Sequence, residues 1–416
     1  MIKVNKPKIR FKNFNDSWSL RKLSDTQTDF KDGNYGEAYP KETDLTSSTQ
    51  GVPFLRGSDL DNGKLTLTNA RYITQSKHNE LISGHLIEDD IVIAVRGSLG
   101  SLGYVGPDNE GWNINSQLAI IRTRKIELIG NYLIQFLLSN RGKKEILSHI
   151  TGTALKQLPI KQLKNIKVPI PKIEEQSAIG SLFRTLDDLL ASYKDNLANY
   201  QSLKVTMLSK MFPKAGQTVP EIRLDGFEGE WELIKLGEFC DLITKGTTAR
   251  SQSEKGKVNF VKVENLKDNE IYPIVKISEE EHLGSLKRSI LCEGDILFSI
   301  AGTLGRTAIV RNNILPANTN QALAIIRGYK LDACFLLVVL SGEVVKDYIR
   351  KNPTVGAQPN LSLEQVSSLK IQAPSMEEQQ AIGSYFNNLD NLIATHQEKI
   401  SQLETLKKKL LQDMFI

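Results

Sequence analysis

The sequence predicts an α+β protein made of two tandem mixed α/β domains, each followed by a long helix, with the two helices pairing as an antiparallel coiled coil. Residues 174–212 open with Glu-Glu-Gln-Ser-Ala-Ile-Gly and close with Met-Phe, and residues 377–415 repeat this arrangement at a constant interval. Apolar residues recur in both stretches at helical spacing. The sequence that flanks each stretch repeats as well, which indicates a tandem duplication.

Steps that alternate between three and four residues form the seam of a coiled coil. The first stretch has Ile179, Leu182, Leu186, Leu189, Tyr193, Tyr200, Leu203 and Met207, and the second has Ile382, Tyr385, Leu389, Leu392, Leu403, Leu406 and Leu410. Each helix would span about 55 to 60 Å. We expect the two helices to pack on each other, since neither has another evident partner. The alternative, two unrelated amphipathic helices on local cores, does not explain the repeated flanks.

The mixed domains repeat in order. The entry Arg10-Phe11 with Trp18 matches Arg223-Leu224 with Trp231. Short β-branched runs predict strands over 91–95, 118–121, 296–300 and 323–326, and helical stretches fall at 132–138, 143–150, 331–340 and 344–350. The glycines of 97–100 and 302–305 indicate a turn between two strands. These features set boundaries of 1–172 and 221–375 for the mixed domains, 173–212 and 376–416 for the helices, and 213–220 for a linker.

Bulk composition limits the class of protein. The chain has 416 residues, a net charge of +5 and a pI near 8.8, which permits a nucleic-acid partner without requiring one. No apolar run approaches the roughly 20 residues of a membrane span, and the N-terminus lacks a secretory signal. The three cysteines are widely spaced, which favours a reducing compartment. We therefore expect a cytoplasmic protein with no membrane partner.

Catalytic motifs are missing. The sequence has no phosphate-binding loop, no dinucleotide-binding turn, no nucleophile elbow and no Asn/Asp-Pro-Pro-aromatic motif of an amino-methyltransferase. The five histidines form no ligand-like cluster, so no metal site and no catalytic residue are predicted. These absences favour a binding protein over an enzyme.

Polar and basic loops on the β scaffolds are the candidate nucleic-acid contacts. Arg, Lys, Asn and Gln can bond base edges, and Ser and Thr can hold phosphates. In the first domain the candidates are Arg96, Ser98, Asn115, Gln117, Lys156 and Gln157. In the second they are Lys245, Thr247, Thr248, Arg250, Thr303, Arg306, Asn320, Gln321, Gln358 and Asn360. For any one of them a solvated loop side chain is the simpler interpretation, so the prediction rests on the set.

Acidic residues and glutamine begin both long helices, at Glu174, Glu175 and Gln176 and again at Glu377, Glu378 and Gln379. Carboxylates in a first helical turn suit the exposed amides and the helix dipole. We interpret these residues as dipole partners or as contacts for another subunit, rather than as a catalytic pair.

Three features occur twice and in the same order: the Arg…Phe…Trp entry, the Gly-x-Leu-Gly turn with its Ala-Ile-Ile-Arg strand, and the Pro…Glu-Gln…Ile-Gly…Leu-Asp helix. In these features the whole chain resembles the specificity subunits of type I restriction-modification systems. The family's usual Pro-Pro or Pro-Leu before Glu-Gln is Pro-Lys-Ile at 171–173 and Pro-Ser-Met at 374–376, which leaves the docking contacts less defined.

The resemblance implies a non-catalytic reader of double-stranded DNA. Each mixed domain would be a target recognition domain for one half of a split, asymmetric site, and the paired helices would set the gap. Two methyltransferase subunits carrying S-adenosylmethionine would dock on this chain, and restriction subunits using ATP and Mg²⁺ would join for cleavage, so this chain itself would bind no cofactor. The rival interpretations are a self-sufficient DNA methyltransferase or nuclease with unrecognised motifs, and a coiled-coil adaptor that never contacts DNA.

Overall fold

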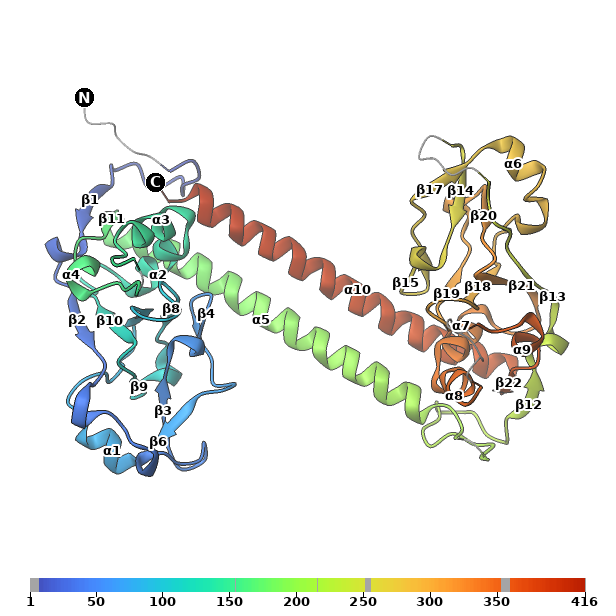
Figure 1. The fold of residues 1–416 in the computed structure, drawn as a ribbon, viewed down its shortest axis with the longest axis horizontal. Coiled ribbons are helices and arrows are strands. Elements are labelled where there is room, and N and C mark those ends of the chain that lie inside the picture. Colours follow the sequence, from blue (N-terminus) through green and yellow to red (C-terminus); the bar gives the residue numbers. More distant parts are fainter. Residues whose placement is uncertain (1–6, 154, 215, 251–255, 353–359, 416) are drawn as a thin grey trace. The chain divides into compact units, whose positions relative to one another are not determined.

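A computed structural model describes residues 7–153, 155–214, 216–250, 256–352 and 360–415 (Figure 1). The chain forms two compact units: unit 1 is Met1–Lys194 with Glu398–Ile416, and unit 2 is Asp195–Gln397. This division differs from the boundaries drawn on the sequence. The reason is that both long helices, α5 (Ile173–Lys210) and α10 (Met376–Asp413), belong partly to each unit.

The described residues of unit 1 form four small sheets. The largest has the order β2-β10-β7-β8 and is antiparallel, and a three-stranded sheet has the order β6-β3-β9, with β3 parallel to β9. The strands are β1 (Ser19–Lys22), β2 (Asp29–Asp32), β3 (Val52–Leu55), β4 (Leu60–Asp61), β5 (Lys64–Leu65), β6 (Arg71–Ile73), β7 (Ile91–Ala94), β8 (Leu102–Tyr104), β9 (Asn113–Ile114), β10 (Leu118–Arg122) and β11 (Lys167–Ile170). The pairs β1-β11 and β4-β5 complete the unit.

Unit 2 repeats this topology strand for strand, which confirms the duplication. Its sheets have the orders β13-β21-β18-β19, β17-β14-β20, β12-β22 and β15-β16. The strands are β12 (Glu232–Lys235), β13 (Cys240–Lys245), β14 (Val258–Val261), β15 (Leu266–Lys267), β16 (Glu270–Ile271), β17 (Val275–Ile277), β18 (Ile296–Ser299), β19 (Thr307–Ile309), β20 (Ala317–Thr319), β21 (Leu323–Tyr329) and β22 (Lys370–Ala373).

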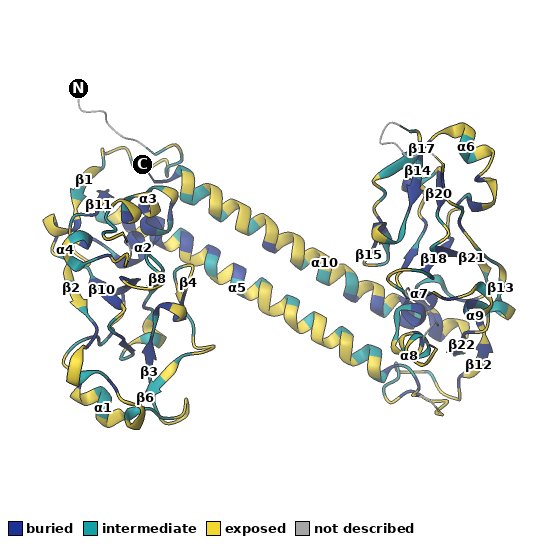
Figure 2. Ribbon diagram, in the orientation of Figure 1, coloured by how far each residue is buried: buried dark blue, intermediate teal, exposed yellow. Residues whose placement is uncertain are grey.

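The predicted helices are confirmed with small shifts at their ends. Unit 1 has α1 (Gln75–Glu80), α2 (Gly130–Leu138), α3 (Asn140–Ser148) and α4 (Ile160–Leu163), and unit 2 has α6 (Glu279–Leu283), α7 (Ala333–Ser341), α8 (Glu343–Lys351) and α9 (Leu363–Ser367). Helices α2 and α7 are buried in the cores, as Figure 2 shows by their dark blue ribbons. The glycine turns also have the predicted place, because Gly97 and Gly302 adopt positive φ angles between two paired strands.

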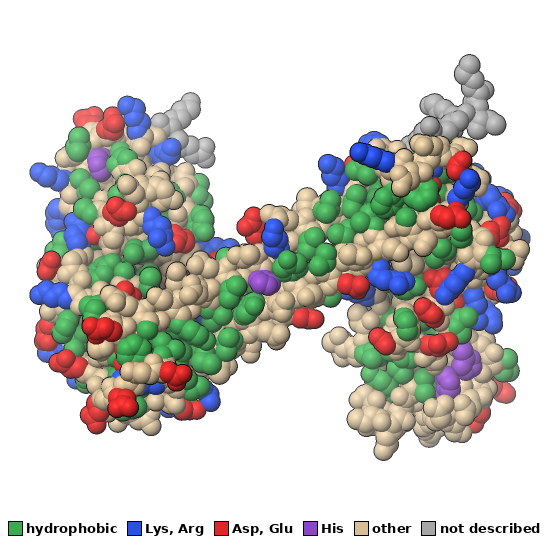
Figure 3. Space-filling model, turned by 180° about the vertical axis from the view of Figure 1, so that it is seen from behind, with side chains coloured by type: hydrophobic (Ala, Val, Ile, Leu, Met, Phe, Trp, Pro, Cys, Tyr) green, Lys and Arg blue, Asp and Glu red, His purple; other side chains and the backbone are tan. Residues whose placement is uncertain are grey.

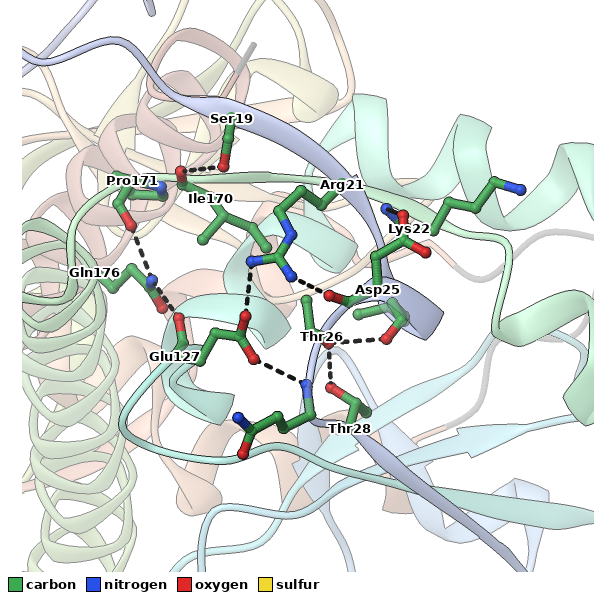
Figure 4. Close-up of polar contacts among 12 residues, drawn as sticks. Ser19, Arg21, Lys22, Asp25, Thr26, Thr28, Glu127, Ile170, Pro171 and Gln176 are labelled. Atoms are coloured by element: carbon green, nitrogen blue, oxygen red, sulfur yellow. Dashed lines mark hydrogen bonds and ion pairs between the residues drawn. The ribbon is translucent and has the colours of Figure 1, made fainter.

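A buried glutamine anchors the start of each long helix. The Gln176 side chain accepts from the backbone N–H of Ile129 (2.9 Å) and donates to the carbonyl oxygens of Glu127 and Pro171 (both 3.0 Å), as Figure 4 shows in part. The Glu127 carboxylate in turn accepts from Arg21 Nη1 at 2.6 Å. Gln379 has the same role in unit 2. Its side chain accepts from the backbone N–H of Asp332 and donates to the carbonyl oxygen of Pro374.

The second glutamate of each helix start is buried in an ion pair. Glu175 accepts from Arg10 Nε and Nη2 at 2.7 and 2.8 Å, and from Trp18 Nε1 at 3.0 Å. Glu378 accepts from Arg223 at 2.8 and 2.7 Å. Hydrogen bonding to these carboxylates raises the pKa of both arginines.

This burial corrects one prediction from the sequence. The contacts with another subunit predicted for Glu175, Gln176, Glu378 and Gln379 do not fit the structure, since these side chains are at most 4% exposed and bond within their own unit. Side chains with so little free surface cannot form an interface with a partner. Glu174 and Glu377 are exposed and keep that prediction.

Each long helix ends in the unit opposite to the one where it begins. Helix α5 begins in unit 1, and the Met211 that follows it is buried in unit 2. Helix α10 begins in unit 2, and the Met414 and Phe415 that follow it are buried in unit 1. The duplicated Met-Phe ends therefore close the hydrophobic core of the other unit.

The two helices contact each other within each unit in an antiparallel sense. In unit 1, Lys194 pairs with Glu404 at 2.7 Å, and Lys407 pairs with Asp187. In unit 2, Lys204 pairs with Asp390. A continuous coiled-coil seam remains a prediction, because four of its leucines are between 38% and 44% exposed: Leu189, Leu203, Leu392 and Leu406. Two helices alone leave that face open.

Candidate nucleic-acid interface

Three loops meet at one edge of the four-stranded sheet in each unit. Because β10 runs antiparallel to β2 and β7, its start lies beside the ends of both strands, and the same register recurs for β21, β13 and β18. We call this edge the loop edge. It consists of loops 33–36, 96–101 and 115–117 in unit 1, and of loops 246–250, 300–306 and 320–322 in unit 2.

Glycine lets the first and third loops touch at both loop edges. A Cβ atom on Gly33 would lie 2.1 Å from the backbone oxygen of Asn115, and one on Gly246 would lie 2.2 Å from the backbone oxygen of Asn320. Only glycine allows such an approach between two backbones. The two loops are therefore held together in the same way in both units.

Arg96 spans the three loops of unit 1. Its Nη1 donates to the Tyr35 hydroxyl at 3.4 Å and to the backbone oxygen of Ser116 at 3.2 Å, and its guanidinium carbon lies 5.4 Å from the centre of the Tyr35 ring. An exposed cation–π contact contributes about 0.5–1 kcal/mol. Burial raises the pKa of the nearby Asp32, and the positive charge of Arg96 opposes that shift.

Unit 2 joins its loops through other residues. Thr248 Oγ1 donates to Gln321 Oε1 at 2.6 Å, and both side chains are exposed. The backbone N–H of Thr247 donates to the carbonyl of Thr319 at 3.0 Å, which ties the first loop to β20. The exposed Lys245 stands at the end of β13, so the predicted residues Lys245, Thr247, Thr248 and Gln321 come together.

A fourth segment joins each loop edge. The backbone N–H of Leu158 donates to the carbonyl oxygen of Val95 at 3.0 Å. This bond places the exposed Lys156 and Gln157 beside the loop that carries Arg96. In unit 2 the N–H of Leu361 donates to the carbonyl of Ile300 at 2.8 Å.

That bond brings the exposed Asn360 to the loop edge of unit 2. The predicted residue Gln358 lies outside the described residues. Thr303 and Arg306 are exposed on the turn between β18 and β19, where Arg306 Nη1 donates to the carbonyl of Val263 at 3.4 Å. Ser98 is exposed on the matching turn of unit 1, and the exposed Arg250 ends the first loop of unit 2.

The two loop asparagines differ from the rest. Asn115 is 3% exposed and its Oδ1 accepts from the N–H of Gln117 at 3.0 Å. Asn320 is half-buried and accepts in the same way from the N–H of Ala322 at 3.2 Å. Both shape their loop, and burial removes Asn115 from the residues that we propose to contact DNA. Gln117 is exposed and stays among them.

The described residues contain no group of three or more His, Cys, Asp or Glu side chains that could hold a metal ion. His78 and His282 instead occupy matching structural positions, with Nδ1 of each ring against the Oδ1 of Asn113 and Asn318 respectively. Burial raises the pKa of Cys240 to about 11, which keeps this thiol protonated. In the described part of the chain, no helix is both long and apolar enough to cross a membrane.

Tyr35 is a loop-edge residue that sequence reasoning missed. Gly33 and Gly246 follow their strands directly, and they are separated by the same number of residues as Trp18 and Trp231. This shared interval places Tyr35 opposite Thr248. The loop edges thus offer hydroxyl, amide and guanidinium groups that can bond base edges and phosphates.

Comparison with known proteins identifies the family. The family model described as "Type I restriction modification DNA specificity domain" matches residues 17–199 and again 228–405. Two relatives come from Methanocaldococcus jannaschii. The MjaVIII type I restriction enzyme specificity subunit is 26% identical over 274 residues, which cover 64% of each chain. The putative MjaX specificity subunit is 25% identical over 415 residues, which cover 95% of this chain and 92% of the relative.

A solved structure has the same fold. The type I restriction-modification S subunit from M. genitalium matches with a TM-score of 0.64 and 17% identity, over 99% of each chain. Because the family model matches most of the chain in two successive copies, this protein belongs to the DNA specificity proteins of type I restriction-modification systems, and each copy of the specificity domain centres on one unit.

Proposed function

We propose that this chain reads a split DNA site, with the loop edge of each unit bound to one half-site. The observation that supports this proposal is the pair of loop edges themselves: one backbone framework occurs twice, and it carries different polar side chains. An identical scaffold with different side chains suits two different half-sites. Joining two modest binding sites in one chain raises the overall affinity through effective concentration.

Replacement of the loop-edge residues Lys245, Thr247, Thr248 and Gln321 by alanine should remove sequence preference at one half-site only. Each lost base contact costs about 1–3 kcal/mol, so affinity for the full site should fall by roughly 100-fold or more. DNA binding by the assembled complex, measured at fixed salt on sites altered in either half, checks this result. Loss of preference at both halves, or at neither, would contradict the proposal.

The partners that we propose are two methyltransferase subunits, which would dock on the long helices. In unit 1 the exposed Leu189 and Leu406 adjoin the ion pair between Asp187 and Lys407 in sequence. Leu203 and Leu392 repeat this arrangement in unit 2, beside the pair between Lys204 and Asp390. Figure 3 shows hydrophobic side chains on the surface of the helices. Two equivalent apolar spots suit two copies of one partner.

In this proposal the chain is not catalytic and carries no cofactor. S-adenosylmethionine would be bound by the methyltransferase subunits, and ATP and Mg²⁺ by restriction subunits that join the complex. The rival enzyme hypothesis predicts turnover by the chain alone. Purified chain incubated with DNA, S-adenosylmethionine and Mg²⁺ should neither methylate nor cut the DNA.

Aspartate at Leu189 and Leu406 together should release one methyltransferase subunit, and aspartate at Leu203 and Leu392 should release the other. A charge placed in an apolar contact is strongly unfavourable. Native mass spectrometry of the complex measures the number of bound subunits. Ser202→Asp adds a single charge about 100° around the helix from Leu203, and it serves as the control for the Leu203→Asp change. Retention of both subunits by both double variants would argue against this docking surface.

A further inference from the structure

The link across each loop edge is built from different residues in the two units. Tyr35 and Thr248 are equivalent, since each stands two residues after the glycine that contacts the third loop. Their partners are not equivalent. By strand register, Arg96 of unit 1 corresponds to Ala301 of unit 2, and Gln321 corresponds to Ser116. The long polar side chain is therefore carried by the second loop in unit 1, as Arg96, and by the third loop in unit 2, as Gln321.

Arg96 is held in one orientation while most of its donors stay available. Its Nη1 is engaged by Tyr35 and by the carbonyl of Ser116, and its side chain is exposed. In the described part of the chain, no hydrogen bond uses Nε or Nη2. A guanidinium fixed against an aromatic ring can present two parallel N–H groups, and the matching base edge is O6 and N7 of guanine.

Gln321 is held in the same way by a different bond. Its Oε1 accepts from Thr248 Oγ1 at 2.6 Å, and no bond from Nε2 occurs within the described residues. The amide still offers both N–H donors and a second lone pair on Oε1. An amide with a free donor and a free acceptor side by side matches N7 and the N6 amino group of adenine.

We propose that Arg96 reads a guanine in the half-site bound by unit 1 and that Gln321 reads an adenine in the half-site bound by unit 2, with Tyr35 and Thr248 as their positioning residues. This inference rests on the proposed function, because it assumes that each loop edge faces a major groove. It assigns one base type to each half-site.

Mapping methylated positions in DNA modified by the assembled complex tests the assignment. The wild-type complex should give a two-part motif with a required G·C pair in one half and a required A·T pair in the other. Arg96→Ala should make that G·C pair tolerant of other bases and leave the second half unchanged. Gln321→Ala should do so for the A·T pair of the other half. Discrimination at each position should fall roughly 10- to 100-fold.

Arg124→Ala and Asn313→Ala are matched controls. Both residues are exposed, and each lies beyond the end of its strand, β10 or β20, that points away from the loop edge. Tyr35→Phe and Thr248→Val keep shape but remove the hydroxyl. They should lower the ratio of affinities for cognate and single-base-altered DNA, with little change in binding to unrelated DNA.

Several results would overturn the assignment. These are an intact motif in Arg96→Ala or Gln321→Ala, relaxation at the wrong base type, or both variants acting on the same half-site. In each case the wild-type complex would still show a split motif, so the proposed function would stand. A wild-type complex without any two-part motif would instead refute the proposed function itself.

Discussion

Replacement of Phe415 by alanine should destabilise unit 1, although residue 415 follows the helix that begins in unit 2. The Phe415 ring is 6% exposed, and its centre lies 5.8 Å from the ring of Tyr132, 5.9 Å from Phe136 and 6.2 Å from Phe183. Removing a buried phenylalanine costs about 3–5 kcal/mol. That loss is a large part of the roughly 5–15 kcal/mol that stabilises a typical domain.

Hydrogen exchange followed by mass spectrometry measures the effect separately in each unit. Phe415→Ala should speed exchange in β7 and β10 and spare β18 and β21. Phe212→Ala is the mirror-image control, since the Phe212 ring packs against Trp231, Phe335 and Phe386 in unit 2. If the Phe415 variant showed faster exchange only in unit 2, the packing of Phe415 in the core of unit 1 would be refuted.

Replacement of Glu175 by alanine should cost about 3–5 kcal/mol, because it leaves a nearly buried cation without its partner. The side chains of Arg10 and Glu175 are 12% and 2% exposed, and Trp18 Nε1 also loses its acceptor. The loss should appear as a lower midpoint of thermal or urea unfolding. Glu174→Ala removes the neighbouring exposed carboxylate and should change stability by no more than about 0.5 kcal/mol.

The second copy provides an internal comparison. Glu378 pairs with Arg223, while Nε1 of the buried Trp231 has no hydrogen-bond partner among the described residues. Glu378→Ala should therefore destabilise unit 2 less than Glu175→Ala destabilises unit 1, by the value of one hydrogen bond to a charged group, about 1.5–3 kcal/mol. Equal losses of stability in the two variants would show that the hydrogen bond from Trp18 to Glu175 adds nothing to the stability of unit 1.

Much of the fold could be predicted because its signals are local. The apolar runs of β7 and β18, the glycine turns after them and the helical spacing of α5 and α10 each depend on a few neighbouring residues. The duplication doubled each signal. The exposed loop positions of Arg96, Lys156, Thr248 and Gln321 could be predicted, because polar loops between strands of a repeated scaffold can be recognised without tertiary information. Their contact with DNA stays a prediction.

The errors have a common physical cause. Glu175 and Gln176 follow a helix-start pattern, so their sequence indicates exposed dipole partners. Their burial depends on Arg10, Trp18 and Ile129, which are far away in the chain. Tyr35 was missed for the same reason, because its importance comes from contact with Arg96 across two loops.

The sequence by itself determined that this protein is a duplicated α+β chain with two long helices and diverged polar loops, because periodicity and turn chemistry are properties of short segments. Only the tertiary structure decided which helix end closes which core, which carboxylates are buried and which loop side chains stand together. Those outcomes depend on packing and pairing between residues that are distant in the chain, and no local pattern reports them.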